Sequence, residues 1–138
     1  MDTLQRAVAL GKLERFEWEI EQRKKLGERY AELIKAAGLP VELLEVAADR
    51  DCVWAQYMIK VDHRAAVIAA LKEQGIPTAV HYPRPLHRQP AYASPDCPAE
   101  SFPHSNAAAD RVMSLPVTAD ISDEDQRRIV EALTQALR

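Results

Sequence analysis

The residues best suited to chemistry are concentrated in segment 78–87, TAVHYPRPLH. An apolar run ends there at His81 and Tyr82, and Arg84 follows between two prolines. An imidazole and a phenol each donate and accept hydrogen bonds, and a guanidinium adds a permanent positive charge. At the end of a strand, this pair can face a cleft and bind a polar substrate. From spacing alone the simpler interpretation is favoured, in which His81 caps the strand and Tyr82 packs on the loop.

No self-contained catalytic motif accompanies this segment. The sequence contains no G-x-G-x-x-G, P-loop, H-E-x-x-H or G-x-S-x-G pattern. Arg64 and the run Arg23-Lys24-Lys25 are expected to be solvated helix residues. We expect no metal site, because none of the histidines pair at a spacing typical of structural zinc. The histidines are His63, His81, His87 and His104.

Composition limits the class of protein. The chain has 138 residues, 47% of them hydrophobic and 28% charged, which is typical of one globular domain and excludes a disordered or disulfide-scaffold protein. A net charge of −3 gives no general attraction for nucleic acid or an anionic membrane. Cys52 and Cys97 are interpreted as reduced thiols. With no apolar run long enough for a membrane span and no signal-peptide pattern at the start, we expect a cytoplasmic protein.

The elements that would position the 78–87 segment follow from hydrophobic periodicity. Residues 2–37 are expected to form one long amphipathic helix, ended by Gly38-Leu39-Pro40. Its apolar stripe requires a larger partner than the rest of the chain supplies. That stripe comprises Leu4, Val8, Leu13, Phe16, Ile20, Leu26, Tyr30, Leu33 and Ile34.

The remaining pattern alternates short strands and helices. Strands are expected at 43–46, 52–61, 77–82 and 113–117, and helices at 62–75, 105–112 and from Ser122 onward. Asp62 and Ser122 are the expected N-caps. The proline-rich segment 83–103 is expected to be irregular. Together these elements predict a two-layer α/β or α+β domain with a small sheet covered by helices. The expected inward residues are Ala66, Val67, Ala70, Leu71, Ile129, Val130, Leu133 and Leu137.

Four segments together resemble a known family. They are MDTLQRAVALGKL at 1–13, HYPRPLHRQPAY at 81–92, FPHSNAAADRVMSLP at 102–116 and ISDEDQ at 121–126. In this order they are similar to the DegT/DnrJ/EryC1/StrS family of pyridoxal-phosphate-dependent nucleotide-sugar aminotransferases, and the similarity covers essentially the whole chain.

The resemblance implies a position within a larger enzyme. Family members have the fold-type I architecture, with a large cofactor-binding domain and a small C-terminal domain that closes over the substrate. Residues 1–38 would be the long linking helix and 39–138 the small α/β domain. The resemblance also implies a homodimer, a nucleotide-linked keto-sugar substrate and glutamate as the usual amino donor. It makes His81 and Tyr82 substrate-binding residues, near the sugar carboxylate in the branch that acts on 3-oxo-glucuronates.

The family's catalytic residues have no counterpart in the sequence. The Schiff-base lysine, the acid that pairs with the pyridinium nitrogen and the ring-stacking residue would all lie upstream, and the family's Asn-x-Arg before Met1-Asp2 is missing. We therefore expect no catalytic residue, no cofactor bound to this chain alone and no transamination by it. Two alternatives remain open: a free-standing non-catalytic interaction domain, or part of a related sugar dehydratase.

Overall fold

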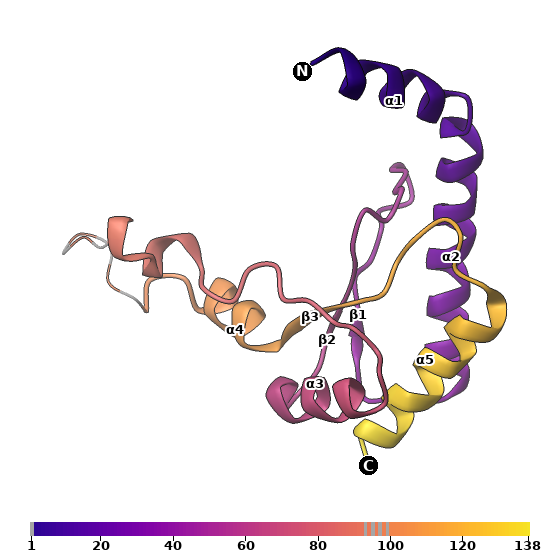
Figure 1. Cartoon of the computed structure of the whole chain (residues 1–138). Helices are drawn as coiled ribbons and strands as arrows, with labels where there is room; N and C mark the ends of the chain where they lie inside the picture. The colour runs from indigo at the N-terminus through magenta and orange to yellow at the C-terminus, as the bar shows by residue number, and fades with distance from the viewer. Residues whose placement is uncertain (1, 93, 95, 97, 99) are drawn as a thin grey trace.

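The computed structural model describes residues 2–92, 94, 96, 98 and 100–138 (Figure 1), so Met1 and Cys97 lie outside the described residues. Five α-helices, three strands and two short 3-10 helices follow one another in the described part of the chain. In order they are α1 (Thr3–Leu13), α2 (Phe16–Ala36), β1 (Glu42–Leu43), β2 (Tyr57–Lys60), α3 (Arg64–Glu73), η1 (Leu86–Arg88), η2 (Pro90–Tyr92), α4 (Pro103–Arg111), β3 (Val112–Leu115) and α5 (Asp123–Ala136).

The strands form an antiparallel sheet in the order β1-β2-β3. Tyr57 lies opposite Leu115 and Ile59 opposite Met113, and all four side chains are buried. Since side chains alternate across a strand, these pairs share the face that meets the helices. The small sheet covered by helices confirms the predicted fold class.

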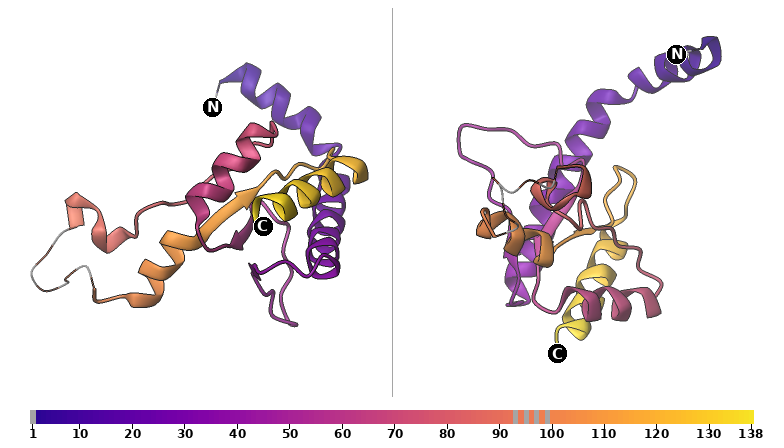
Figure 2. Two further views of the ribbon diagram at one scale, coloured as in Figure 1. Left: turned by 90° about the horizontal axis from the view of Figure 1, so that it is seen from below. Right: turned by 90° about the vertical axis from the view of Figure 1, so that its left-hand side faces the viewer.

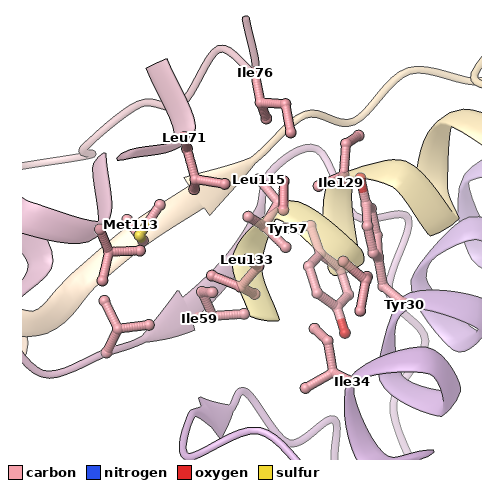
Figure 3. Packing of buried hydrophobic residues seen from close by; sticks show 14 of the residues in the cluster. Tyr30, Ile34, Tyr57, Ile59, Leu71, Ile76, Met113, Leu115, Ile129 and Leu133 are labelled. Atoms are coloured by element: carbon pink, nitrogen blue, oxygen red, sulfur yellow. The ribbon is translucent and has the colours of Figure 1, made fainter. Parts of the chain in front are cut away.

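The core lies between this sheet face and three helices (Figure 3). Helix α2 contributes Leu26, Tyr30 and Ile34, and Tyr30 packs against Tyr57 with ring centroids 4.8 Å apart. The Tyr30 hydroxyl donates to the carbonyl of Pro116 at 2.9 Å, which connects α2 to the chain leaving β3. The other helical core residues are Val67 and Leu71 of α3 and Ile129, Val130, Ala132 and Leu133 of α5.

A fully buried glutamine joins α2 to α5. The Gln126 amide donates to the carbonyl of Leu26 at 3.0 Å, and its oxygen accepts from Arg29 Nη1 at 3.0 Å. Arg29 also pairs with Asp123 in the first turn of α5. The buried polar group is therefore satisfied at both ends, as burial requires.

The expected single helix over 2–37 is wrong, because the structure divides it into α1 and α2 at Glu14-Arg15. Arg15 has φ −101° and ψ 0°, and its N–H bonds to Lys12. None of the described α1 residues is buried, and the helix projects from the body (Figure 2). With no packing surface to keep α1 collinear with α2, helix periodicity alone does not maintain a straight helix.

The start of α3 also differs from expectation. Asp62 does not cap the helix; His63 is the N-cap residue, at φ +51° and without a side-chain cap bond. The Asp62 carboxylate instead pairs with Arg111 Nε at 3.0 Å. Ala66 is exposed rather than inward, whereas Val67 and Leu71 are buried as expected. By contrast, Ser122 caps α5 as predicted, accepting from the Asp125 N–H at 3.0 Å.

Candidate functional site

His81 and Tyr82 lie just beyond the edge of the sheet. The expected strand over 77–82 is wrong, because only Ala79 pairs, through reciprocal bonds with Ser114 of β3 (N···O distances of 2.8 and 3.3 Å). Pro77 has no N–H to donate, and Pro83 follows directly after Tyr82, which limits the length of a ladder here. The single bridge still fixes the place where the chain leaves the sheet, two residues before His81.

The two side chains of the pair are both exposed. Their ring centroids are 5.9 Å apart, with the planes inclined at 76°, and the peptide bond between them is cis. Tyr82 has 77% of its surface exposed. The expectation that Tyr82 packs on the loop is therefore wrong, and its phenol is free to meet a ligand that approaches this edge.

The described residues between 82 and 103 form a long arm that leaves the domain after the pair (Figures 1 and 2). Its outgoing and returning limbs meet where the rings of His87 and Phe102 lie 4.9 Å apart. The expected irregular segment contains two single-turn 3-10 helices, η1 and η2, and leads back through α4. The structure thus gives the arm a defined base beside His81 and Tyr82.

Arg64 holds the last turn of α4, where the chain returns from the arm to the sheet. Its guanidinium donates to the carbonyls of Ala109 and Val112, the latter at 3.1 Å, and so satisfies the last turn of α4. The expectation that Arg64 is solvated is wrong, since it is half-buried between α3 and the α4–β3 junction. Helix composition predicted a surface residue, whereas the partner carbonyls lie more than forty residues away in sequence.

An ionic cluster closes the same end of the sheet. Glu42 of β1 accepts from Arg111 at 2.5 Å and from Lys60 at 3.1 Å, and Arg111 also pairs with Asp62. The bonds from Arg111 and Lys60 lower the pKa of the Glu42 carboxyl. Glu42 and Asp62 in turn raise the pKa of Arg111. This cluster connects β1 and β2 to the last residue of α4 and to Asp62 just before α3, so its role is to hold the framework.

A hollow lies between α2 and residues 44–56. It is an open cavity of about 800 Å³ with an apolar floor that includes Leu43 and Trp54. Arg23 donates to the Trp54 carbonyl at 3.2 Å, and Lys24 pairs with Asp51 at 2.5 Å, which raises the lysine pKa and lowers that of Asp51. The prediction that this basic run is merely solvated is therefore wrong for Arg23 and Lys24, whereas Lys25 is exposed as expected. The other charged residues that line it are Glu28, Lys35, Glu45 and Arg50, a mixture of both signs that favours no single ligand charge.

The residues of this chain do not by themselves fit a pyridoxal phosphate site. Lys24 and Lys60 are held by Asp51 and Glu42, and the other lysines lie on α1, α2 and α3. Schiff-base chemistry needs an amine directed at the substrate, and the described contacts bring none to His81 and Tyr82. Across the described ranges, no group of three or more His, Cys, Asp or Glu side chains could hold a metal ion. In the same residues no helix is both long and apolar enough to cross a membrane.

The chain has relatives of known family. The family model for the DegT/DnrJ/EryC1/StrS aminotransferase family matches residues 1–134. The chain belongs to this family. A Pseudomonas aeruginosa protein named UDP-2-acetamido-2-deoxy-3-oxo-D-glucuronate aminotransferase is 42% identical over 134 residues, covering 97% of this chain and 36% of that protein. A dTDP-3-amino-3,6-dideoxy-alpha-D-galactopyranose transaminase from Aneurinibacillus thermoaerophilus is 35% identical, covering 98% of this chain and 36% of that protein.

Solved structures of family members have the same fold. A Brucella abortus DegT DnrJ EryC1 StrS aminotransferase superposes with a TM-score of 0.87 at 34% identity, covering 99% of this chain and 36% of that one. DesV of S. venezuelae, solved in complex with a ketimine intermediate, superposes with a TM-score of 0.90 at 31% identity, covering 100% of this chain and 37% of that one. The chain therefore spans just over a third of the length of these DegT/DnrJ/EryC1/StrS relatives.

Proposed function

We propose that this chain is the substrate-closing small domain of a pyridoxal-phosphate-dependent aminotransferase that acts on a nucleotide-linked keto-sugar. The supporting observation is the match over nearly the whole chain to just over a third of a P. aeruginosa relative whose name gives that activity. In this proposal residues 39–138 form the domain that closes, and 1–38 link it to the large domain. The cofactor is held by the large domain, and glutamate is the amino donor. The chain alone is inactive.

His81 and Tyr82 are the substrate-binding residues of this proposal. Both are exposed at the sheet edge, Tyr82 to 77%. A phenol and an imidazole there offer donors and acceptors to sugar hydroxyl or carboxylate oxygens. Since the pair stands at the base of the arm, closure of the domain would bring both side chains onto the sugar together. Their contribution is to bind and orient the sugar and to exclude water from it.

The exposed half of the linking element supports a larger assembly. Leu4, Val8 and Leu13 on α1 and Phe16 on α2 are 52 to 81% exposed. An apolar row of this kind is rarely left to water in a stable monomer. We propose that it packs on the large domain within a homodimer in the cytoplasm, where a free thiol such as Cys52 stays reduced.

A chimera tests the proposal directly. The corresponding C-terminal residues of the P. aeruginosa relative are replaced by residues 1–134 of this chain, and amino transfer to the keto-sugar of that relative is measured. We expect an active chimera in which Tyr82→Phe and His81→Asn raise KM for the sugar by about tenfold, since each removes a hydrogen bond to the substrate.

Tyr92→Phe is the matched control, because Tyr92 is an exposed tyrosine of the same arm, 60% accessible. A chimera that binds the cofactor but shows equal KM values for the Tyr82, His81 and Tyr92 variants would contradict the assignment. If the separate 138-residue chain traps pyridoxal phosphate stoichiometrically on one lysine with borohydride, its proposed inactivity is refuted.

A further inference from the structure

Residues 81–92, which begin with the substrate pair, have an unusually positive charge for this chain. Residues 81–92 contain Arg84 and Arg88 and two histidines but no aspartate or glutamate, in a chain whose net charge is −3. Both arginines are exposed. Within the described part of the chain, neither guanidinium takes part in an ion pair or a side-chain hydrogen bond. This local positive charge is therefore available to a ligand.

The backbone between the two arginines is well defined. Pro83 and Pro85 restrict the chain on either side of Arg84, and Pro85 is buried. The Arg88 N–H bonds to the Pro85 carbonyl at 3.0 Å, and the Gln89 side chain donates to the Arg84 carbonyl at 3.3 Å. Arg84 thus lies two residues before the single turn η1, and Arg88 is the last residue of that turn. The contact between the rings of His87 and Phe102 connects this turn to the returning limb of the arm.

The turn also lies close to the substrate pair. Only Pro83 separates Tyr82 from Arg84, so their Cα atoms are at most about 7 Å apart. That is comparable to the width of one sugar ring. A sugar bound at His81 and Tyr82 would place its anomeric phosphate within reach of Arg84, and Arg88 ends the turn that follows in the chain.

We propose that Arg84 and Arg88 bind the diphosphate of the nucleotide-linked sugar, an inference that rests on the proposed function. A guanidinium matches two phosphate oxygens with a planar pair of donors, and two guanidinium groups balance the charge of a diphosphate. Selection for a nucleoside-diphosphate sugar over a free sugar then comes from the arm of this chain. His81 and Tyr82 read the sugar itself.

The test uses the isotopically labelled 138-residue chain, titrated with UDP and with inorganic pyrophosphate and followed by amide NMR shifts. We expect both probes to shift the amides of residues 84–89 and uridine to leave them unchanged. Arg84→Gln and Arg88→Gln should each raise the dissociation constant by about tenfold, as expected for loss of a charge-assisted hydrogen bond. Arg127→Gln is the matched control, because Arg127 is an exposed arginine on α5, and it should leave the constant unchanged.

The outcomes separate this inference from the proposed function. If pyrophosphate leaves residues 84–89 unperturbed, or if Arg127→Gln weakens binding as much as Arg84→Gln, the inference is overturned while the KM effects of His81 and Tyr82 in the chimera still stand. If pyrophosphate binding depends on Arg84 and Arg88 but the chimera variants of His81 and Tyr82 have normal KM, the diphosphate site stands and the sugar assignment fails. Tyr82→Phe should not change pyrophosphate affinity, and a tenfold loss would overturn the division of roles.

Discussion

Replacing Tyr30 by Phe tests how the linking helix α2 is held to the sheet. Tyr30 has no exposed surface, and its hydroxyl donates to the Pro116 carbonyl at 2.9 Å. The substitution removes one hydrogen bond and leaves a half-buried carbonyl without that donor, which costs about 1 to 2 kcal/mol of the free energy of unfolding. The ring stays in place against Tyr57, so little packing is lost.

Urea unfolding followed by far-UV circular dichroism measures this loss. With a typical slope of about 2 kcal/mol per molar, the midpoint should fall by about 0.5 to 1 M with the slope unchanged. Tyr57→Phe is the matched control: Tyr57 is 2% exposed, and among the described residues its hydroxyl forms no hydrogen bond. Its midpoint should move by less than about 0.3 M, since no partner is lost. Equal losses for the two variants, or none for Tyr30→Phe, would refute the assignment of stability to the bond between Tyr30 and Pro116.

Three further predictions concern packing, pH and association. Gly27→Ala should destabilise the domain by about 1 to 3 kcal/mol, because the added Cβ would overlap the indole of Trp54, and a change in Trp54 fluorescence should accompany the loss. Burial raises the pKa of Tyr57 to about 12 and raises that of Tyr30 further above its ordinary value near 10. Since both folded-state values are raised, stability should be complete below about pH 10 and fall as pH rises toward 12, and pH-dependent urea midpoints check this. The isolated chain should self-associate through the α1 row, and Leu13→Glu should shift light-scattering masses toward the monomer; a wild-type chain that is monomeric at high concentration would contradict this.

Hydrophobic periodicity predicted the helices that pack on the core, but it did not predict the break between α1 and α2. Within the predicted stripe, Leu26, Tyr30 and Ile34 are buried against the rest of this chain, because the 3.6-residue repeat places them on one face. The members of the stripe before Arg15 and Phe16 itself are exposed. The break at Arg15 left no comparable signal. The periodic pattern continues through it, and only the absence of a packing partner in the structure accounts for two helices instead of one.

His81 and Tyr82 remain a predicted site, and the sequence contained no sign of the contacts that support the region around them. The resemblance identified His81 and Tyr82, and the structure shows them at the sheet edge and exposed. Arg64 was assigned to solvent because its neighbours in sequence are those of a helix start, whereas its acceptors come from the end of α4. Gln126 ends the ISDEDQ segment, yet a lone glutamine beside the acidic first turn of a helix gives no sign that it is the buried connection between α2 and α5.

The sharing of the core by α2 has a consequence for recombination between relatives. Tyr30 and Ile34 lie in the same buried cluster as Ile59 and Leu133. In a hybrid gene joined at Gly38, α2 and the rest of the core would come from two different relatives. Because the core is closely packed, each mismatch in side-chain volume between them would destabilise the fold. A junction at the Glu14-Arg15 break cuts no buried contact of the described residues. Crossovers placed there should yield folded hybrids far more often.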